Sequence, residues 1–323
     1  MLTAWIIFFT LVLGLLALDL FVFHRTAHEV KMKEALGWSA FWITLSLIFN
    51  GFIYILYEKG LFGLQAASPE VPDGRTAAIL FFTGYIIEKS LSVDNVFVIA
   101  LIFSFFQVPL RFQHRVLFWG ILGALIMRGI MIGLGAALIT RFHWILYIFG
   151  ALLLVTAGRM LFGSGEPDPA THPLVRLIRR FVPLSDEYDG QKLITKVSGK
   201  TMLTPLGLCL IVIESMDLMF AIDSVPAVFA VTQDAYIVFT CNVFAVLGLR
   251  ALYFALAGVV EKFHYLKMSL AVLLALIGVK MLLKDILHTI PNITLYTLGA
   301  IALILGTGIV ASLVRARRLS QQS

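Results

Sequence analysis

The sequence predicts an all-α, polytopic membrane protein with about nine transmembrane helices. Of its 323 residues, 60% are hydrophobic and 14% are charged, whereas soluble domains are about 45–50% apolar and about 25% charged. A bilayer is crossed by about 20 apolar residues in a helix. Nine runs meet that length, at about residues 3–23, 37–57, 77–106, 116–139, 143–162, 204–231, 235–258, 265–284 and 291–314. We expect residues 1–323 to form a single transmembrane domain in the lipid bilayer.

The basic residues predict how this domain is oriented. With the N-terminus outside and the C-terminus in the cytoplasm, inside segments hold 16 Lys and Arg residues and outside segments hold 4. Such an excess is typical of cytoplasmic loops. The long connector 163–203, rich in Gly, Pro and charge, is then a solvated cytoplasmic linker. We expect a multi-pass protein of the inner membrane. The net charge of +6 is spread over many short loops, so nucleic-acid binding is not expected.

Polar anchors at equal spacings indicate an internal repeat. The fifth and eighth runs each place a histidine 16 residues before a basic residue, and the fourth and seventh each place a valine 12 residues before an arginine. These pairs are His143 and Arg159, His264 and Lys280, Val116 and Arg128, and Val238 and Arg250. Apolar helices can also align by chance. We interpret spans 3–5 and 6–8 as copies, and three spans per copy makes them inverted repeats, a plan typical of transporters.

Acidic residues within the apolar runs mark the candidate site. Glu88, Asp94 and Asn95 lie in the third run, and the sixth run repeats the pattern of acid, five residues, Asp, Asn or Ser, and Val. Its members are Glu214, Asp217, Asp223 and Ser224, of which the last three match Glu88, Asp94 and Asn95. Carboxylates in hydrocarbon are costly and commonly line ion or substrate pathways. Residues six apart on a regular helix lie about 240° apart, so these acids share a face only if a helix breaks near Asp94 or before Pro226.

The donor types favour a hard or borderline divalent cation. All seven histidines fall in loops or at span ends, so an imidazole site for Zn²⁺ or Cu is not expected. Carboxylate and carbonyl oxygens suit Mn²⁺, Ca²⁺ or Mg²⁺, and a thioether from Met216 or Met219 would favour Mn²⁺. Such methionines more often simply pack. The competing interpretation of the acids is structural pairing with Arg128 and Arg250, at matched mid-span positions.

The two acidic blocks also resemble a known family. Glu88-Lys-Ser-Leu-Ser-Val-Asp94-Asn95-Val-Phe and Glu214-Ser-Met-Asp217, followed by Ala-Ile-Asp223-Ser224-Val-Pro226-Ala, are similar to those of the TerC family. The start of the chain, with Asp19 and Thr-Leu-Ser-Leu-Ile-Phe-Asn50, looks like its Alx branch. The resemblance implies a plan like that of the LysE exporters, with the acids of spans 3 and 6 as functional residues. It also implies roles in tellurite resistance, redox modulation or Mn²⁺ export.

These observations lead to one functional expectation and its alternatives. We expect a divalent-cation exporter, with Mn²⁺ the favoured substrate, working by alternating access and coupled to H⁺ or Na⁺. The chain has no nucleotide-binding motif, and we expect neither enzymatic activity nor a cofactor. The alternatives are a LysE-like exporter of an organic solute and a tellurite-resistance or redox role. Cys209 and Cys241, on different runs, give the redox role little support. The oligomeric state is left open.

Overall fold

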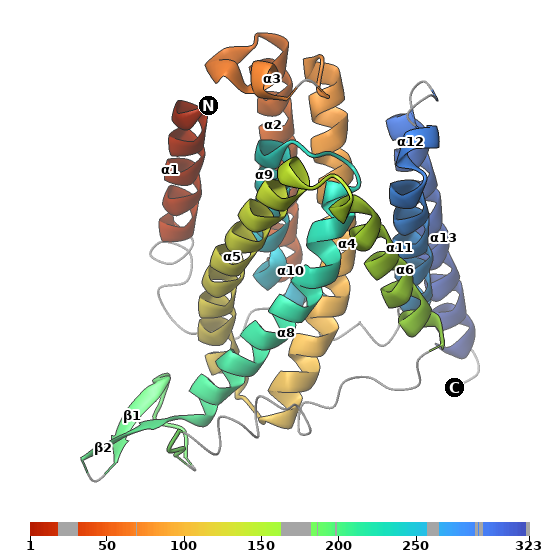
Figure 1. Cartoon of the computed structure of the whole chain (residues 1–323). Helices are drawn as coiled ribbons and strands as arrows, with labels where there is room; N and C mark the ends of the chain where they lie inside the picture. The colour runs from red at the N-terminus through yellow and green to blue at the C-terminus, as the bar shows by residue number, and fades with distance from the viewer. Residues whose placement is uncertain are drawn as a thin grey trace.

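The computed structural model describes residues 1–18, 32–68, 70–162, 182–185, 187–197, 199–256, 265–287, 290 and 293–320. Asp19, His264 and residues 163–181 of the connector lie outside these ranges. In the described parts, long helices stand side by side, and a small β-hairpin projects from one end of the bundle (Figure 1).

Each predicted apolar run contains a helix or a pair of helices. The long helices are α1 (Leu2–Leu18), α2 (Met32–Glu58), α4 (Gly74–Phe105), α5 (Leu110–Arg141), α6 (Ile145–Phe162), α8 (Pro205–Phe229), α9 (Ala235–Leu247), α10 (Leu249–Leu256), α11 (Leu266–Leu282) and α13 (Ile293–Ser320). Short helical turns form η2 (Leu61–Gly63), α3 (Leu64–Ala67) and α12 (Lys284–Leu287). The apolar runs therefore predicted where the helices lie.

The protein is a polytopic membrane protein. Among the described residues, five helices are long and apolar enough to cross a membrane, or six if the bent pair α9–α10 is one span. Helices α1 and α11 have 17 residues each, and α4 carries buried charge. Large apolar side chains such as Ile48, Leu134 and Leu303 are exposed on the outside of the bundle, as lipid contact requires. The count of nine spans stays a prediction.

Side-chain caps set where several of these helices begin. The Asp73 carboxylate accepts a hydrogen bond from Thr76 N at 2.6 Å, at the start of α4. Thr204 Oγ1 accepts one from Gly207 N at 3.1 Å, at the start of α8. The Asp234 carboxylate caps α9 in the same way. Each cap satisfies backbone N–H groups that have no partner within the helix, so short polar residues at the ends of apolar runs fix the helix starts.

The break within a span lies in neither acidic helix. Both α4 and α8 are continuous helices, and Pro226 lies inside α8, so a break near Asp94 or before Pro226 is not present. Instead the seventh run bends by 41° between α9 and α10. There Lys89 Nζ donates a hydrogen bond to the Ala245 carbonyl oxygen at 3.3 Å. A Cβ on Gly248 would lie 2.7 Å from Lys89 Nζ, so glycine leaves room for this contact.

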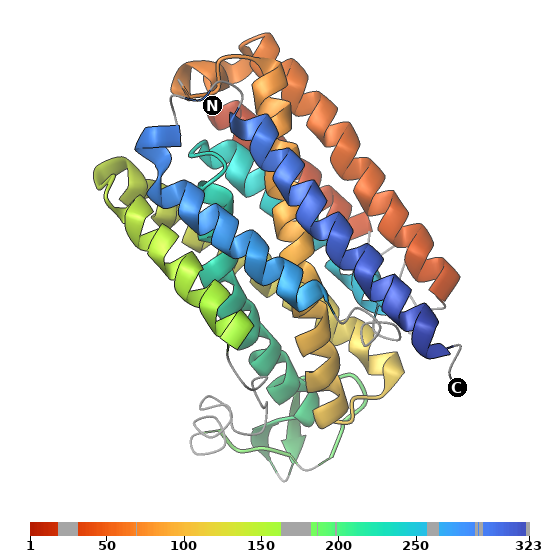
Figure 2. The ribbon, with the colours of Figure 1, turned by 90° about the vertical axis from the view of Figure 1, so that its right-hand side faces the viewer.

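Helix directions meet one requirement of an inverted repeat. Helices α4 and α8 run in opposite directions, and so do the neighbours α6 and α11 (Figures 1 and 2). The α6–α11 pair packs closely at two glycines, since a Cβ on Gly278 would lie 2.9 Å from the Gly150 carbonyl oxygen. Superposition of spans 3–5 on spans 6–8 is the further requirement, so the repeat stays a prediction.

Part of the connector is more ordered than a solvated linker. Strand β1 (Ile194–Val197) pairs antiparallel with β2 (Lys200–Leu203). Gly199 has φ +78° in the turn between them, a left-handed conformation that glycine adopts at little cost. Thr204 Oγ1 donates to the Lys192 carbonyl oxygen at 2.8 Å, which ties the hairpin to the start of α8. That the connector is a solvated cytoplasmic linker stays a prediction.

Candidate functional site

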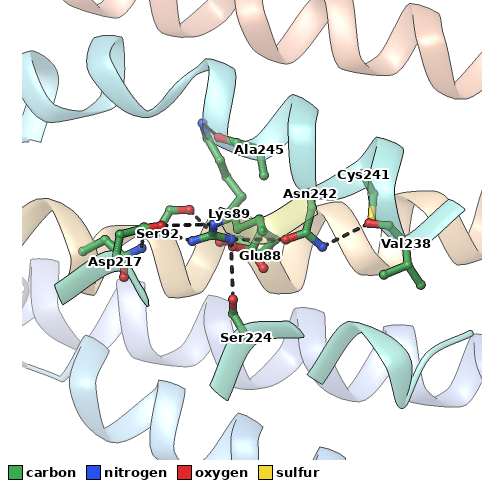
Figure 3. Close-up of polar contacts among 11 residues, drawn as sticks. Glu88, Lys89, Ser92, Asp217, Ser224, Val238, Cys241, Asn242 and Ala245 are labelled. Carbon is green, nitrogen blue, oxygen red and sulfur yellow. Dashed lines mark hydrogen bonds and ion pairs between the residues drawn. The ribbon is translucent and has the colours of Figure 1, made fainter. Parts of the chain in front are cut away.

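The Arg128 guanidinium forms the centre of a buried polar cluster. Arg128 lies in the middle of α5 and is 2% exposed. Glu88 from α4, Asp217 and Ser224 from α8, and Asn242 from α9 converge on it (Figure 3). Two consecutive helices, α4 and α5, therefore meet two later ones, α8 and α9, at one charged side chain in the bundle interior.

Arg128 neutralises two carboxylates at once. Its Nη1 forms an ion pair with Glu88 Oε1, and its Nη2 lies 3.2 Å from Asp217 Oδ1. Nη1 also donates to Asn242 Oδ1 at 3.2 Å and to Ser224 Oγ at 3.4 Å. A buried ion pair is tolerated only when further hydrogen bonds satisfy the charged groups, and the guanidinium has five N–H donors arranged for this. The structural pairing expected for Arg128 is therefore present.

Some polar atoms of the cluster can still accept a hydrogen bond. Asn95 Nδ2 donates to Asp217 Oδ1 at 3.5 Å. Within the described part of the chain, Asn95 Oδ1 and Glu88 Oε2 are buried and have no hydrogen-bond partner. Most buried side-chain polar atoms do have a partner. The cluster thus holds two oxygen acceptors that could receive a further donor or a cation.

A small cavity opens beside Asn95 and Asp217. Its volume is about 20 Å³, enough for one water-sized particle. Beyond these two polar side chains the walls are apolar and come from α4, α5, α8 and α10. They comprise Val98, Ile99, Leu117, Gly120, Ile121, Ala124, Ile213, Met216, Phe220 and Leu249. Asp217 and Asn95 are therefore the two polar residues in the lining of a space that holds one water-sized particle.

The seven predicted ligands do not all meet at this cluster. Glu88, Asn95, Asp217 and Ser224 come together around Arg128. Glu214 lies on α8 with its carboxylate against Gly123 of α5, where an added Cβ would overlap with Oε1.

Asp94 and Asp223, the second acids of the two matched patterns, lie in different surroundings. Asp223 is half-buried and accepts a hydrogen bond from Thr156 Oγ1 of α6 at 2.8 Å. Asp94 is half-buried on α4. The described residues contain no group of three or more His, Cys, Asp or Glu side chains placed to hold a metal. A shell made only of carboxylates is thus not what this arrangement offers, and the ligand roles stay predictions.

The sequence did not identify the uncharged residues that contact the buried acids. Thr156 and Gly123 sit in apolar helices where a lone threonine or glycine gives no signal. Lys89 could be recognised as a buried charge, but its contact with Ala245 depends on the α9–α10 bend. Asn242, a polar residue within a predicted span, could be recognised as a possible helper of the acids but not as a partner of Arg128. Its amide nitrogen donates to the Val238 carbonyl oxygen at 3.1 Å, which leaves its Oδ1 to face Arg128.

The two cysteines are buried in separate places. Cys209 on α8 belongs to the apolar cluster around Tyr253, whereas Cys241 on α9 packs in the larger core. Neither forms a disulfide. Both therefore serve as small core residues in this structure, in line with the sequence-based expectation.

Comparison with known proteins shows extensive similarity. Residues 73–320 match the family described as "Integral membrane protein TerC family". An uncharacterized membrane protein of Myxococcus xanthus is 46% identical over 314 residues, 97% of this chain and 92% of its own length. The "Putative membrane-bound redox modulator Alx" of Escherichia coli K12 is 48% identical over 287 residues, 88% of this chain and 87% of its own. No solved structure matches.

Proposed function

This chain belongs to the TerC family of integral membrane proteins, and from that premise we propose that it is a transporter that exports a divalent cation, Mn²⁺ above others. The observation that supports this most is the cavity of about 20 Å³ beside Asn95 and Asp217. The lining of this cavity includes Asp217, Asn95 and Met216, residues that carry a carboxylate, an amide and a thioether. Oxygen donors with one softer sulfur suit Mn²⁺ better than Ca²⁺.

In this proposal Arg128 acts as an internal counter-ion. The guanidinium and a divalent cation both neutralise Glu88 and Asp217, so they compete for the same carboxylates. When the ion reaches Asp217 and Asn95, Arg128 would keep its contacts with Glu88 and Asn242 and give up Asp217, whose bonds from Nε and Nη2 are 3.5 Å and 3.2 Å long. When the ion leaves, Arg128 re-forms them. This exchange avoids an unpaired buried carboxylate at any stage.

Alternating access would be provided by movement between two helix groups. The α6–α11 pair, held together at Gly150 and Gly278, contacts α8 through Thr156 and Asp223. We propose that this pair shifts against the core of α2, α4, α5, α8 and α9. Asp94, Glu214 and Asp223 would line the path to Asp217. In a protein of nine spans, inverted repeats of spans 3–5 and 6–8 would give two related conformations, one open to each side of the membrane.

Location and energy requirements complete the proposal. We place the protein in the inner membrane with the N-terminus outside and the C-terminus and connector in the cytoplasm, on the distribution of basic residues. Moving a doubly charged ion outward against about 100 mV takes about 4.6 kcal/mol before any concentration term. Without a nucleotide motif in the sequence, H⁺ or Na⁺ antiport would supply that energy.

Transport by purified protein in liposomes tests the proposal. We expect wild type to move Mn²⁺ under an imposed pH or Na⁺ gradient, measured with a metal-sensitive dye inside the vesicles. Asp217→Asn keeps the side-chain size but removes the negative charge that offsets the lost hydration of the ion, so it should reduce the flux at least tenfold. Asp285→Asn is the matched control, because Asp285 is exposed on α12 and bonds to Tyr147. It should transport like wild type.

Two results would count against the proposal. Wild type that moves no Mn²⁺ under either gradient would remove the substrate assignment and favour export of an organic solute or a redox-linked role. Equal flux in wild type and Asp217→Asn would keep the substrate but dismiss the site. In that case the cluster around Arg128 would be structural.

A further inference from the structure

A second, larger cavity lies at the other end of the helices from the β-hairpin. It has a volume of about 290 Å³, near the lower limit for small-molecule sites. Its walls come from the first turns of α4 and α13, the end of α8 and the last turn of α11 with α12. These elements meet at the end of the bundle that also holds the N-terminus (Figures 1 and 2). The cavity is separate from the Arg128 cluster.

Positive charge dominates the lining of this cavity. Lys280, from the last turn of α11, and Lys284, at the start of α12, both line it and are half-buried. Within the described residues neither ammonium has an ion pair or hydrogen bond. The one acid in the lining, Glu70, is exposed. Two half-buried ammonium groups that have no ion pair among the described residues favour an anion placed between them.

Neutral donors surround the two lysines. Thr76, Thr294 and Gln233 also line the cavity, and their side chains carry hydroxyl and amide donors. Ile293 and Thr294 are the first residues of the 28-residue helix α13, so its N-terminal N–H groups and the positive end of its dipole lie at the cavity wall.

We propose that this cavity binds a tetrahedral oxyanion of the phosphate type. Such an anion carries several strong acceptor oxygens, which match two ammonium groups, two hydroxyls and the start of a helix. The same chemistry is offered by free inorganic phosphate and by the phosphodiester of an anionic lipid headgroup. Because the lining joins α4, α11, α12 and α13, the bound anion would hold these helices together. This inference does not rest on the proposed cation transport.

Ligand-dependent unfolding of the full-length protein in a neutral detergent tests this inference. The midpoint of thermal unfolding is followed as sodium phosphate replaces sodium chloride at constant ionic strength, and separately as phosphatidylglycerol replaces phosphatidylcholine in the micelles. A ligand that binds only the folded state raises the midpoint in a concentration-dependent way. We expect wild type to be stabilised in at least one series. The double variant Lys280→Gln/Lys284→Gln should weaken the apparent affinity at least tenfold.

Two controls make the outcome decisive. Lys59→Gln removes an exposed lysine just after α2 that does not line the cavity, and it should respond like wild type. Lys280→Arg/Lys284→Arg keeps both charges and should retain binding. If the double glutamine variant cannot be purified, Lys284→Glu alone serves, because it reverses one charge on the short α12; it too should lose at least tenfold in affinity.

The two ligand series distinguish the possible sources of the anion. Stabilisation by phosphate alone assigns a free anion, stabilisation by phosphatidylglycerol alone assigns a lipid headgroup, and stabilisation by both supports the shared chemistry. The proposal is overturned if neither ligand stabilises wild type. It is overturned equally if the lysine variants respond as wild type does, or if Lys59→Gln loses the response to the same extent.

Discussion

Replacing Arg128 by methionine should be among the most destabilising single changes in this chain. Methionine has similar length and suits an apolar interior, but it removes both ion pairs and the bonds to Ser224 and Asn242. Glu88, which is fully buried, and Asp217 are then left without a counter-charge. Loss of one partner from a buried ion pair costs about 3–5 kcal/mol, so we expect the free energy of unfolding to fall by about that amount.

The measurement is reversible unfolding in mixed micelles, read from tryptophan fluorescence. Arg141→Met is the matched control, because Arg141 lies at the exposed end of the same helix and should change stability by less than about 1 kcal/mol. The triple variant Glu88→Gln/Arg128→Met/Asp217→Asn removes the carboxylates as well. It should recover much of the loss, since neutral amides are far less costly to bury than carboxylates.

Two results would refute this reasoning. If Arg128→Met unfolds like Arg141→Met, the carboxylates of Glu88 and Asp217 do not depend on the guanidinium. If the triple variant is no more stable than Arg128→Met, the cost arises from packing and not from unpaired charge. A smaller loss with full recovery in the triple variant would keep the mechanism and reduce its magnitude.

Three further changes test the surrounding structure. Gly278→Ala should cost about 1–3 kcal/mol, because the new Cβ meets backbone of α6 at 2.9 Å; thermal unfolding measures it, and an unchanged midpoint would contradict the close α6–α11 contact. Asp73→Ala should cost about 0.5–2 kcal/mol by removing the cap on Thr76, whereas Asp73→Asn should cost less. A hydrogen bond from Thr195 holds the pKa of Asp189 below its ordinary value of 3.8. The stability that Asp189 contributes is therefore complete above pH 3.8 and is lost as the pH falls through the lower folded pKa. Amide hydrogen exchange in the β1–β2 hairpin should become faster over this pH range. Asp189→Asn should remove this pH dependence.

The sequence predicted the helical architecture well because lipid imposes a simple rule. Backbone groups in hydrocarbon must bond within their own segment, so long apolar runs become helices. The same cost of burying charge made Glu88 and Asp217 recognisable as candidate site residues, with structural pairing to Arg128 as the competing interpretation. Where these side chains meet depends on how α4, α5 and α8 cross. A buried carboxylate nevertheless needs a positive charge beside it, and this limits the residues that can be its partner.

Features set by packing between helices were not predictable. The bend between α9 and α10 brings the Ala245 carbonyl oxygen to Lys89 of another helix, and a lone glycine in an apolar run does not predict such a bend. Asp223 was expected beside the other acids, but its partner is Thr156 of α6. Contacts of this kind depend on the relative rotation of helices, which the hydrophobic pattern of a lipid-facing bundle specifies poorly.

Direct localisation of a bound ion tests the transport site most sharply. Crystals or oriented samples of the full chain, prepared with Mn²⁺, can be examined by anomalous scattering at the manganese edge, with Asp217→Asn as the comparison. We expect one peak within direct coordination distance of Asp217 and Asn95, in the cavity between α4 and α8, and no such peak in the variant. A manganese peak elsewhere, or a peak at this cavity that survives in Asp217→Asn, would contradict the assignment of this cluster as the cation site.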